Sequence, residues 1–303
     1  MIETGNPSLT LGIKECWKRC FTMSDPRYIE FFFRYVYKPE YGWANVEDET
    51  MTGAVCVIPH AMMFNGRVLR VSMIKGACTM PDYRNEGRVK ELITTVLDYC
   101  SHNELITLVS ARYDGFKKYG FEPVFYRHDY TLTRDDVKRI TNFGCAYEPS
   151  PIDMLKVYSV FIRRFNGFYA RDLEYFVNLK KEIVSRGGKI VAYYDSKNQI
   201  QGYATILIEG KEARVEECIY LNALALNKLI NAALQERSTV HLHVSPAENL
   251  SKLYPNVPKE EYPYIMARLN DADLFSRLFN VEVKTVQEAM AISNRPLNLN
   301  ENA

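Results

Sequence analysis

The stretch from Gly76 to Val89 holds residues in an order suited to binding an anion. A run typical of a strand ends near Met80, and a loop containing Gly87 opens a pattern typical of a helix. The first turn of a helix has N–H groups without partners and the positive end of the dipole, and glycine lets the backbone approach a phosphate closely. Arg84 and Arg88 add positive charge. We therefore expect a pyrophosphate-binding loop here.

A simpler interpretation of this loop stays open. A glycine near the start of a helix, beside arginines, commonly means only a turn and a solvated face, and for the loop alone we favour that interpretation by roughly two to one. A second motif changes the balance. Residues 116–121 read Phe-Lys-Lys-Tyr-Gly-Phe, a short helix that ends at a glycine before the next strand.

The two motifs together resemble the GNAT superfamily of acetyltransferases. Arg84, Gly87 and Val89 stand in the places of its coenzyme A motif, Arg/Gln-x-x-Gly-x-Gly/Ala, with valine replacing the usual small residue. Residues 165–172 resemble the opening of the second, degenerate GNAT domain of the Eis-like branch, and residues 266–272 resemble the segment that leads into its third, sterol-carrier-protein-like domain. The resemblance covers nearly the whole chain, with too few residues for a complete third domain.

The resemblance implies a site for acetyl-CoA as cosubstrate, without a metal. Ala77, Cys78 and Thr79 would offer backbone groups to the pantetheine arm, as an added strand would. Ala111 and Arg112 map onto another coenzyme contact of the family. The pyrophosphate would be held mainly by main-chain N–H groups of the loop and helix start, at Arg84, Asn85, Glu86, Gly87, Arg88, Val89 and Lys90.

Direct acetyl transfer to a primary amine needs groups that move protons. A free alkylammonium has a pKa of about 10.4, so a base or water path must remove its proton, and an acid must protonate the departing thiolate. In the family this acid is commonly a tyrosine, but Phe116 occupies its place here. Tyr113 and Tyr119 lie three residues to either side and are our candidates, with ordinary packing as the alternative. Eis-like enzymes also place a terminal carboxylate in the active site, which would be Ala303.

Other residues with reactive side chains carry weaker expectations. Asp25 and Glu30 could attract a cationic amine, although we favour a helix cap and a solvated acid. His60 is a base by chemistry alone, next to Pro59 at an expected strand end.

Two pairs of potential metal ligands are interpreted in the same way. Cys16 and Cys20 are spaced one helical turn apart, and His241 and His243 share a strand face, but each pair lacks partners to complete a metal site. We expect the two cysteines to be ordinary helix residues, and the two histidines to be hydrogen-bonded within the protein or exposed.

The elements that position these residues follow from hydrophobic periodicity. Two helices are expected over residues 9–37, broken at the Ser24-Asp25-Pro26 turn, and a hairpin of strands at 50–59 and 67–80 around Asn65-Gly66. A helix from Tyr83, a strand at 105–110, a short helix at 113–119 and a strand at 121–132 follow. This order predicts a mixed α/β fold.

The second half repeats the order of helices, then strands, then a strand-helix-strand. Helices are expected at 152–165, 171–186 and 222–236, and strands at 189–194, 201–209, 214–221 and 239–244. A helix and a strand are expected over 271–290, and disorder over 294–303. We predict tandem GNAT-like acyl-CoA N-acyltransferase domains at 1–145 and 146–265, with a short extension at 266–303.

Composition narrows the classes of function. The 303 residues carry 38 basic and 37 acidic side chains, so no charge excess indicates nucleic acid or an anionic membrane as a partner. Seven cysteines without a Cys-x-x-Cys pair, and no apolar run long enough to span a bilayer, predict a reduced, cytoplasmic protein. A homo-oligomer is compatible with the aromatic content.

Three functions remain open on this sequence. The first is an N-acetyltransferase acting on a small-molecule or peptidyl amine. The second is an acyl-CoA-binding sensor or partner-binding protein with impaired catalysis, motivated by Phe116 and the short C-terminal segment. The third is a structural α/β domain without coenzyme.

Overall fold

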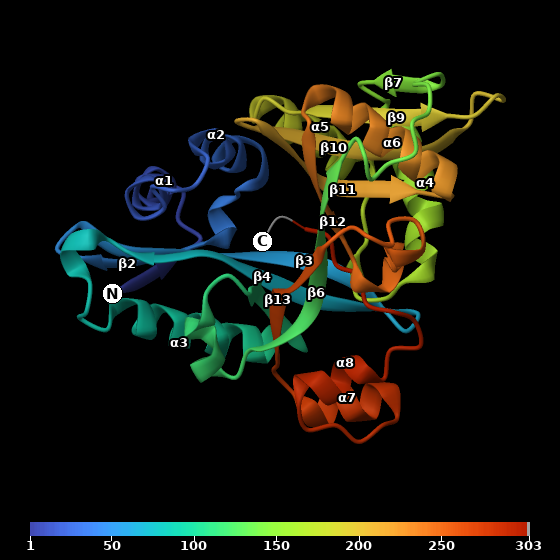
Figure 1. The fold of residues 1–303 in the computed structure, drawn as a ribbon. Helices are drawn as coiled ribbons and strands as arrows, with labels where there is room; N and C mark the ends of the chain where they lie inside the picture. Colours follow the sequence, from blue (N-terminus) through green and yellow to red (C-terminus); the bar gives the residue numbers. More distant parts are fainter. Residues whose placement is uncertain (302–303) are drawn as a thin grey trace. The chain divides into compact units, whose positions relative to one another are not determined.

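The computed structural model describes residues 1–301, which form two compact units (Figure 1). Unit 1 comprises residues 1–124 and 263–293, and unit 2 comprises residues 125–262 and 294–301. Each unit is therefore built from two separate stretches of the chain. Ala303, with its expected terminal carboxylate, lies outside the described residues.

Unit 1 is organised around a mixed sheet. Its strands run in the order β1, β2, β3, β4, β5 and the second part of β13, and β4 and β5 are parallel while the other neighbours are antiparallel. The strands are β1 (Ile2–Thr4), β2 (Gly42–Glu47), β3 (Thr50–Phe64), β4 (Arg67–Thr79), β5 (Ile106–Ser110) and β13 (Lys259–Leu269). The expected hairpin is confirmed, with Asn65 and Gly66 both at positive φ.

The alternation of side chains along β3 explains how helices cover both faces of this sheet. Ala54, Cys56 and Ile58 pack in one apolar cluster with Trp17 and Phe32 of the N-terminal helices, whereas intervening residues pack with the helix that follows β4. The helices are α1 (Leu9–Cys20), α2 (Pro26–Phe31), a π-helix at Phe32–Val36, α3 (Arg88–Asn103), the 3-10 helix η4 (Asp114–Tyr119), α7 (Ala272–Phe279) and α8 (Val286–Ala291). The strand expected before residue 290 is wrong, because α8 begins there with a capping box at Thr285 and Glu288.

Unit 2 repeats the arrangement of an antiparallel set of strands followed by a helix and a parallel strand. Its strand order is β6, β12, β11, β10, β9, β7, with β11 and β12 parallel. The strands are β6 (Glu122–Thr133), β7 (Cys145–Tyr147), β8 (Phe168–Tyr169), β9 (Lys189–Tyr194), β10 (Ile200–Glu209), β11 (Glu212–Tyr220) and β12 (Thr239–Val244). The helices are α4 (Pro151–Phe161), α5 (Leu173–Ser185) and α6 (Ala223–Glu236), close to the expected positions.

The expected disorder at the end of the chain is wrong for residues 294–301. Arg127 donates to the carbonyl of Leu299, and the backbone N–H of Asn298 donates to the carbonyl of Asn166 at 2.9 Å. Leu299 itself is buried. The polar composition of this segment does not reveal its order, because that order depends on contacts with residues far away in the sequence.

The mixed α/β class predicted from the sequence is confirmed by this architecture. None of the helices within residues 1–301 combines the length and the apolar character needed to cross a bilayer.

Candidate functional site

The segment expected to pair with pantetheine lies where β4 extends beyond its parallel neighbour. The pairing between β4 and β5 runs from Val71 opposite Ile106 to Ile74 opposite Val109, and within the described residues it stops there. On its other edge β4 continues to pair with β3, up to Thr79 opposite Gly53. The register with β3 shifts between Ala54 and Cys56, so Gly76 and Ala77 lie at a bulge. For residues 76–79 the edge toward β5 has no strand partner among the described residues.

The three expected pantetheine contacts lie on this segment. Ala77 and Thr79 are half-buried, and Cys78 is buried with its side chain in the cluster under α1. Only their backbone edge, and not the Cys78 side chain, is oriented for strand-like pairing with a ligand. Their backbone role toward a coenzyme stays a prediction.

The loop after β4 places Gly87 at the start of α3 in a conformation that favours glycine. Gly87 has φ 79° and ψ 2°, and Asn85 also has a positive φ of 67°. No side chain caps the helix, and the N–H groups of Lys90 and Glu91 already bond to the Gly87 carbonyl. A Cβ built on Gly87 meets no atom within 4 Å, so space adjoins the helix start.

The charges around this loop differ from the sequence-based expectation in one respect. Arg88 forms ion pairs with Glu47 and with Glu86, the latter at 3.2 Å, so part of its charge is neutralised within the protein. Arg84 and Lys90 are exposed. Arg88 therefore fixes the loop to β2, while Arg84 and Lys90 supply charge to the solvent side.

The second expected coenzyme contact follows β5. The Ala111 N–H donates to the Tyr264 carbonyl at 3.0 Å, and the Arg112 N–H donates to the Ser110 hydroxyl at 3.3 Å. Arg112 is exposed and Ala111 is half-buried against the apolar cluster under α3. These bonds turn the chain out of the strand and into η4.

The two tyrosine candidates flank Phe116 on η4 but differ in exposure. Phe116 is buried in the apolar cluster, with ring centroids 6.2 Å from Tyr113 and 6.4 Å from Tyr119. The Tyr113 ring lies over Gly115 and is 68% exposed, whereas Tyr119 packs against the apolar cluster. Tyr113 is therefore the more accessible proton donor of the two.

The candidate acids near the second helix are held by neighbouring cations. Asp25 caps α2 by accepting from the Arg27 N–H at 3.0 Å and also pairs with the Arg27 side chain. Glu30 pairs with Lys14 at 2.6 Å and Lys18 at 2.8 Å, and these hydrogen bonds lower its pKa to about 2. Asp25 is a helix cap as we favoured, while Glu30 is ion-paired as well as exposed.

His60 does not lie at a strand end, because β3 continues to Phe64. It pairs with Val71 of β4 in the middle of the hairpin. Burial, assisted by the positive charge of Lys75, lowers the pKa of His60 to about 3. His60 is thus a neutral strand residue at physiological pH.

His241 and His243 have the protein partners expected of a satisfied pair. His241 lies 3.2 Å from Glu212 and 3.4 Å from Asp129, and His243 hydrogen-bonds to the Tyr262 hydroxyl at 2.7 Å. Burial lowers the pKa of His243 to about 4 even though Asp129 opposes the shift.

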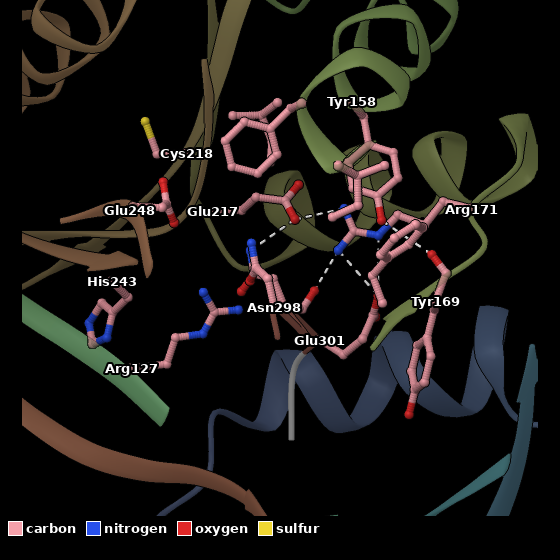
Figure 2. Close-up of a pocket in the computed structure, with 15 residues that line it drawn as sticks. Arg127, Tyr158, Tyr169, Arg171, Glu217, Cys218, His243, Glu248, Asn298 and Glu301 are labelled. Atoms are coloured by element: carbon pink, nitrogen blue, oxygen red, sulfur yellow. Dashed lines mark hydrogen bonds and ion pairs between the residues drawn. The ribbon is translucent and has the colours of Figure 1, made fainter. Parts of the chain in front are cut away.

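Sequence reasoning missed a polar pocket inside unit 2 (Figure 2). Its centre is Arg171, whose guanidinium lies 2.7 Å from Glu217 and 3.2 Å from Glu301. The Arg171 side chain is only 2% exposed, and it lies over the rings of Tyr158 and Tyr175. Asn300 completes the arrangement by donating to Glu217 at 3.0 Å.

The signal for this pocket is present in the sequence but is easily misread. In the sequence of β11, Glu217 takes an alternate position in series with the apolar residues Ala213, Val215 and Ile219, and a carboxylate at such a buried position must find a partner there. Its partners are Arg171, Tyr203 and Asn300, which come from three distant parts of the chain. Periodicity locates the strand but does not identify partners so far away.

Comparison with known proteins finds a family match within unit 1. Residues 2–124 match the family model described as "Acetyltransferase (GNAT) domain". Among curated protein sequences, none shows significant similarity to the chain.

Several solved structures share the fold at low sequence identity. A probable N-acyltransferase from Enterococcus faecalis V583 is 19% identical with a TM-score of 0.73, over 89% of this chain and 72% of that chain. A GCN5-related N-acetyltransferase from Anabaena variabilis is 16% identical with a TM-score of 0.72, over 89% and 73%. Eis1 from Mycobacterium abscessus is 12% identical with a TM-score of 0.68, over 91% and 75%. At these identities the likeness concerns the fold, and the family match supports acyl transfer as the general reaction. Residues 2–124 are thus similar to a GNAT acetyltransferase domain.

Proposed function

We propose that this protein transfers an acetyl group from acetyl-CoA to a primary amine of a small molecule or peptide, by direct transfer in a ternary complex. The observation that carries the proposal is the combination of residues 76–79, whose edge toward β5 has no strand partner among the described residues, and the start of α3 at Gly87, which no side chain caps. Both belong to unit 1 and to the stretch that matches the acetyltransferase family.

The residues present fit the two polar parts of coenzyme A. A strand edge without a partner offers N–H and C=O groups to an amide-containing chain such as pantetheine. An uncapped helix start offers N–H groups and a favourable dipole to a diphosphate, with Gly87 leaving room for close approach. Arg84 and Lys90 would add long-range attraction.

Acetyl-CoA would supply an activated thioester acyl group, and the protein would supply position and proton transfer. Ala77, Cys78 and Thr79 would hold the pantetheine through their backbone. Tyr113 would donate the proton to the departing sulfur, because its hydroxyl is accessible while Phe116 has none. Tyr119 is the second candidate for this role.

We further propose that unit 2 is a degenerate GNAT-like domain in an Eis-like tandem arrangement. The support is the repeated order of elements: antiparallel β9, β10 and β11, then α6, then β12 parallel to β11, as in β2, β3, β4, α3 and β5.

A second function has a specific observation in its favour. Phe116 occupies the place of the usual tyrosine, is buried, and has no hydroxyl to donate a proton. A protein with this site and no proton donor would bind acyl-CoA as a sensor or partner-binding module without transferring the acyl group.

The test is calorimetric titration with acetyl-CoA of wild type, Gly87→Glu and a matched control, Gly210→Glu. Gly210 also has a positive φ, of 59°, and its Cβ position is equally open, but it lies between β10 and β11 of unit 2. Both substitutions impose a similar backbone strain of about 1–2 kcal/mol. We expect binding to be lost in Gly87→Glu alone, through bulk and negative charge. Absence of binding in wild type would overturn both functions.

Turnover then separates the two functions. A screen of polyamines, aminoglycosides and peptide amines with acetyl-CoA should reveal acetylated product, detected by mass spectrometry and by release of free thiol. Tight binding without product from any of these amines would favour the sensor.

A further inference from the structure

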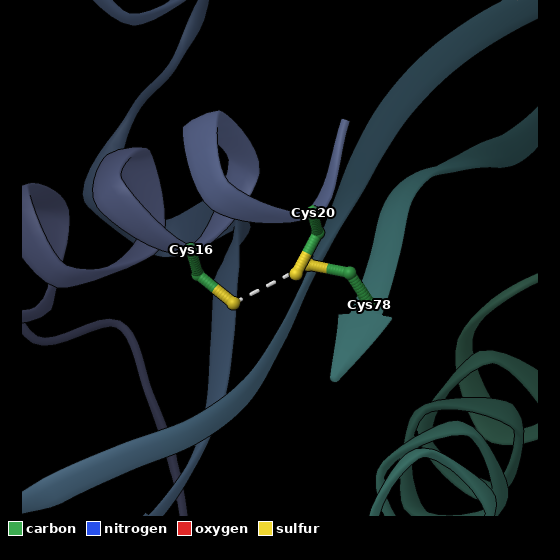
Figure 3. Close-up of side chains that lie close together, drawn as sticks. All are labelled: Cys16, Cys20 and Cys78. Carbon is green, nitrogen blue, oxygen red and sulfur yellow. Dashed lines mark hydrogen bonds between the residues drawn. The ribbon is translucent and has the colours of Figure 1, made fainter. Parts of the chain in front are cut away.

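Three cysteine thiols from two elements meet in unit 1. Cys16 and Cys20 project from α1, and Cys78 projects from β4 toward them (Figure 3). All three sulfur atoms lie within 4.8 Å of one another, and the Cys16 and Cys78 sulfurs are 3.4 Å apart. We call these three residues the thiol cluster. The cluster supplies the third ligand that the sequence alone did not reveal for Cys16 and Cys20.

The packing of α1 on the sheet brings the thiols together. The spacing of Cys16 and Cys20 places both on the same helix face, and strand alternation turns Cys78 to the face that α1 covers. Trp17 lies so close to Gly76 that a Cβ there would meet its ring at 2.0 Å. Gly76 therefore permits the close approach of α1 to β4 on which the cluster depends.

The cluster is chemically different from the other cysteines of unit 1. Hydrogen bonding from Cys78, together with Cys16 and the charge of Arg84, lowers the pKa of Cys20 to about 6. Hydrogen bonding with Cys16 and Cys20 holds the pKa of Cys78 well above the usual range. By contrast, burial raises the pKa of Cys100 to about 12, as expected of an inert core thiol.

We propose that Cys16, Cys20 and Cys78 bind one thiophilic d10 metal ion, with Zn²⁺ as the reference ion. Thiolates are the ligands that such soft ions prefer. Sulfur atoms of a tetrahedral zinc site, with Zn–S bonds of about 2.3 Å, lie about 3.8 Å apart. The Cys16 and Cys78 sulfurs at 3.4 Å, and the limit of 4.8 Å on all three separations, are compatible with that value after a small adjustment. Three protein ligands leave one position for a ligand from solution, as in open zinc sites.

Binding requires a proton balance and a route of entry. Zn²⁺ displaces the protons still held by the thiols, which pass to the buffer, and no atom changes oxidation state. Cys16 and Cys78 are buried, whereas Cys20 is half-buried and offers the accessible sulfur. Because a bound ion would join α1 to the segment of β4 proposed to hold pantetheine, the site would also tie the N-terminal helix to the coenzyme strand.

The first experiment is titration of the reduced, full-length protein with Co²⁺, followed by competition with Zn²⁺. We expect one ion per chain, with thiolate-to-cobalt charge-transfer absorption and tetrahedral d–d bands. Cys16→Ser, Cys20→Ser and Cys78→Ser should each weaken binding at least about tenfold, the scale of loss when a metal site is disturbed. Cys145→Ser is the matched control, since Cys145 is also half-buried but lies in unit 2.

A second measurement keeps the test independent of how the variants fold. In wild type, alkylation of Cys20 followed by mass spectrometry should slow in the presence of stoichiometric Zn²⁺, while alkylation of Cys145 should not change. Absence of stoichiometric Co²⁺ and Zn²⁺ binding after reduction, with unchanged alkylation, would overturn the proposal in favour of a packed thiol cluster. A reversible disulfide within the cluster, without metal binding after its reduction, would also overturn it. Neither measurement depends on acetyl-CoA binding.

Discussion

Units 1 and 2 share an order of elements but differ at the point where that order could hold a ligand. In unit 1, residues 80–87 separate β4 from α3, include left-handed Asn85 and Gly87, and leave the helix without a side-chain cap. In unit 2, only residues 221–222 separate β11 from α6, and the Asn222 side chain accepts from the Ala225 N–H. The same framework therefore presents free N–H groups in one unit and satisfies them internally in the other.

The strands that precede these two helices, β4 and β11, show the same contrast. Within the part of the chain that the structure describes, residues 76–79 of β4 have no strand partner on one edge. By contrast, β11 beyond its pairing with β12 presents Glu217 to residues of the segment 294–301. In unit 2 the protein's own chain contributes Asn298, Asn300 and Glu301 to the pocket lining. Two units with the same order of elements can thus differ in whether these polar groups have partners within the chain.

The largest effect is expected when the buried ion pair between Arg171 and Glu217 of unit 2 is removed. Arg171→Ala leaves the buried Glu217 without its cation, so we expect unit 2 to lose about 3–5 kcal/mol of unfolding free energy. Native-state hydrogen exchange, read for each unit by mass spectrometry, measures this loss. Arg214→Ala is the control, because its ion pairs are more exposed and should contribute about 1 kcal/mol or less. Equal effects would contradict a special role for the buried arrangement.

The next effect concerns the chemistry proposed for unit 1. Tyr113→Phe should lower kcat for acetyl transfer by about a hundredfold or more, because it removes the proposed proton donor, while leaving acetyl-CoA affinity unchanged. Steady-state kinetics with calorimetry measure both quantities. Tyr119→Phe should have little effect if Tyr113 is the donor, and a reversed pattern would assign the role to Tyr119.

A histidine in each unit allows pH to distinguish them. His60 and His243 have pKa values lowered to about 3 and about 4, below the value of about 6.5 in an unfolded chain. The unfolded state therefore binds a proton first as pH falls below 6.5, and each unit loses stability by up to about 1.4 kcal/mol per pH unit until its histidine titrates in the folded state.

His60→Gln should flatten this dependence in unit 1 only, and His243→Gln in unit 2 only. Hydrogen exchange at pH 7, 6 and 5 checks the assignment unit by unit. An unchanged slope in both variants would show that other groups dominate the acid response.

The smallest effect sharpens the contrast between the two helix starts. Asn222→Ala removes the cap of α6 and should cost unit 2 about 1 kcal/mol. Asp172→Ala is the control, since Asp172 caps α5 in the same unit in the same way, through the Tyr175 N–H. Similar losses in the two variants would show that the short turn before α6 is an ordinary capped turn. Acetyl-CoA binding by the double variant Asn222→Ala, Gly87→Glu would contradict this, because the site in unit 1 would then be blocked.

Much of the fold followed from local patterns, because periodicity and turn chemistry act over a few residues. The hairpin at Asn65-Gly66 and the helix from Arg88 needed nothing distant. The strand at Lys259–Leu269 was missed because Pro263 and its charged start obscure alternation, and β1 is too short to show it. Its identity depends on pairing with β5, which the sequence does not display.

The candidate site was predictable in part for the same reason. Gly87 and its loop are contiguous in sequence, so their geometry agrees with the expectation, and residues 77–79 lie on the expected strand. The thiol cluster and the Arg171 pocket were not predicted, because each joins residues from distant segments. Contacts of this kind depend on how helices and strands pack, which hydrophobic periodicity does not encode.

The pairing of β5 with residues 265–269 has a consequence for folding during synthesis on the ribosome. Synthesis runs from the N-terminus, so β5 emerges well before its neighbour, with residues 125–262 made in between. At about 5–20 residues per second, this leaves the outer edge of β5 unpaired for on the order of ten seconds. During that time the nascent chain exposes the unpaired edge of the apolar strand β5 to other chains. We expect chaperones to bind the nascent chain at this strand.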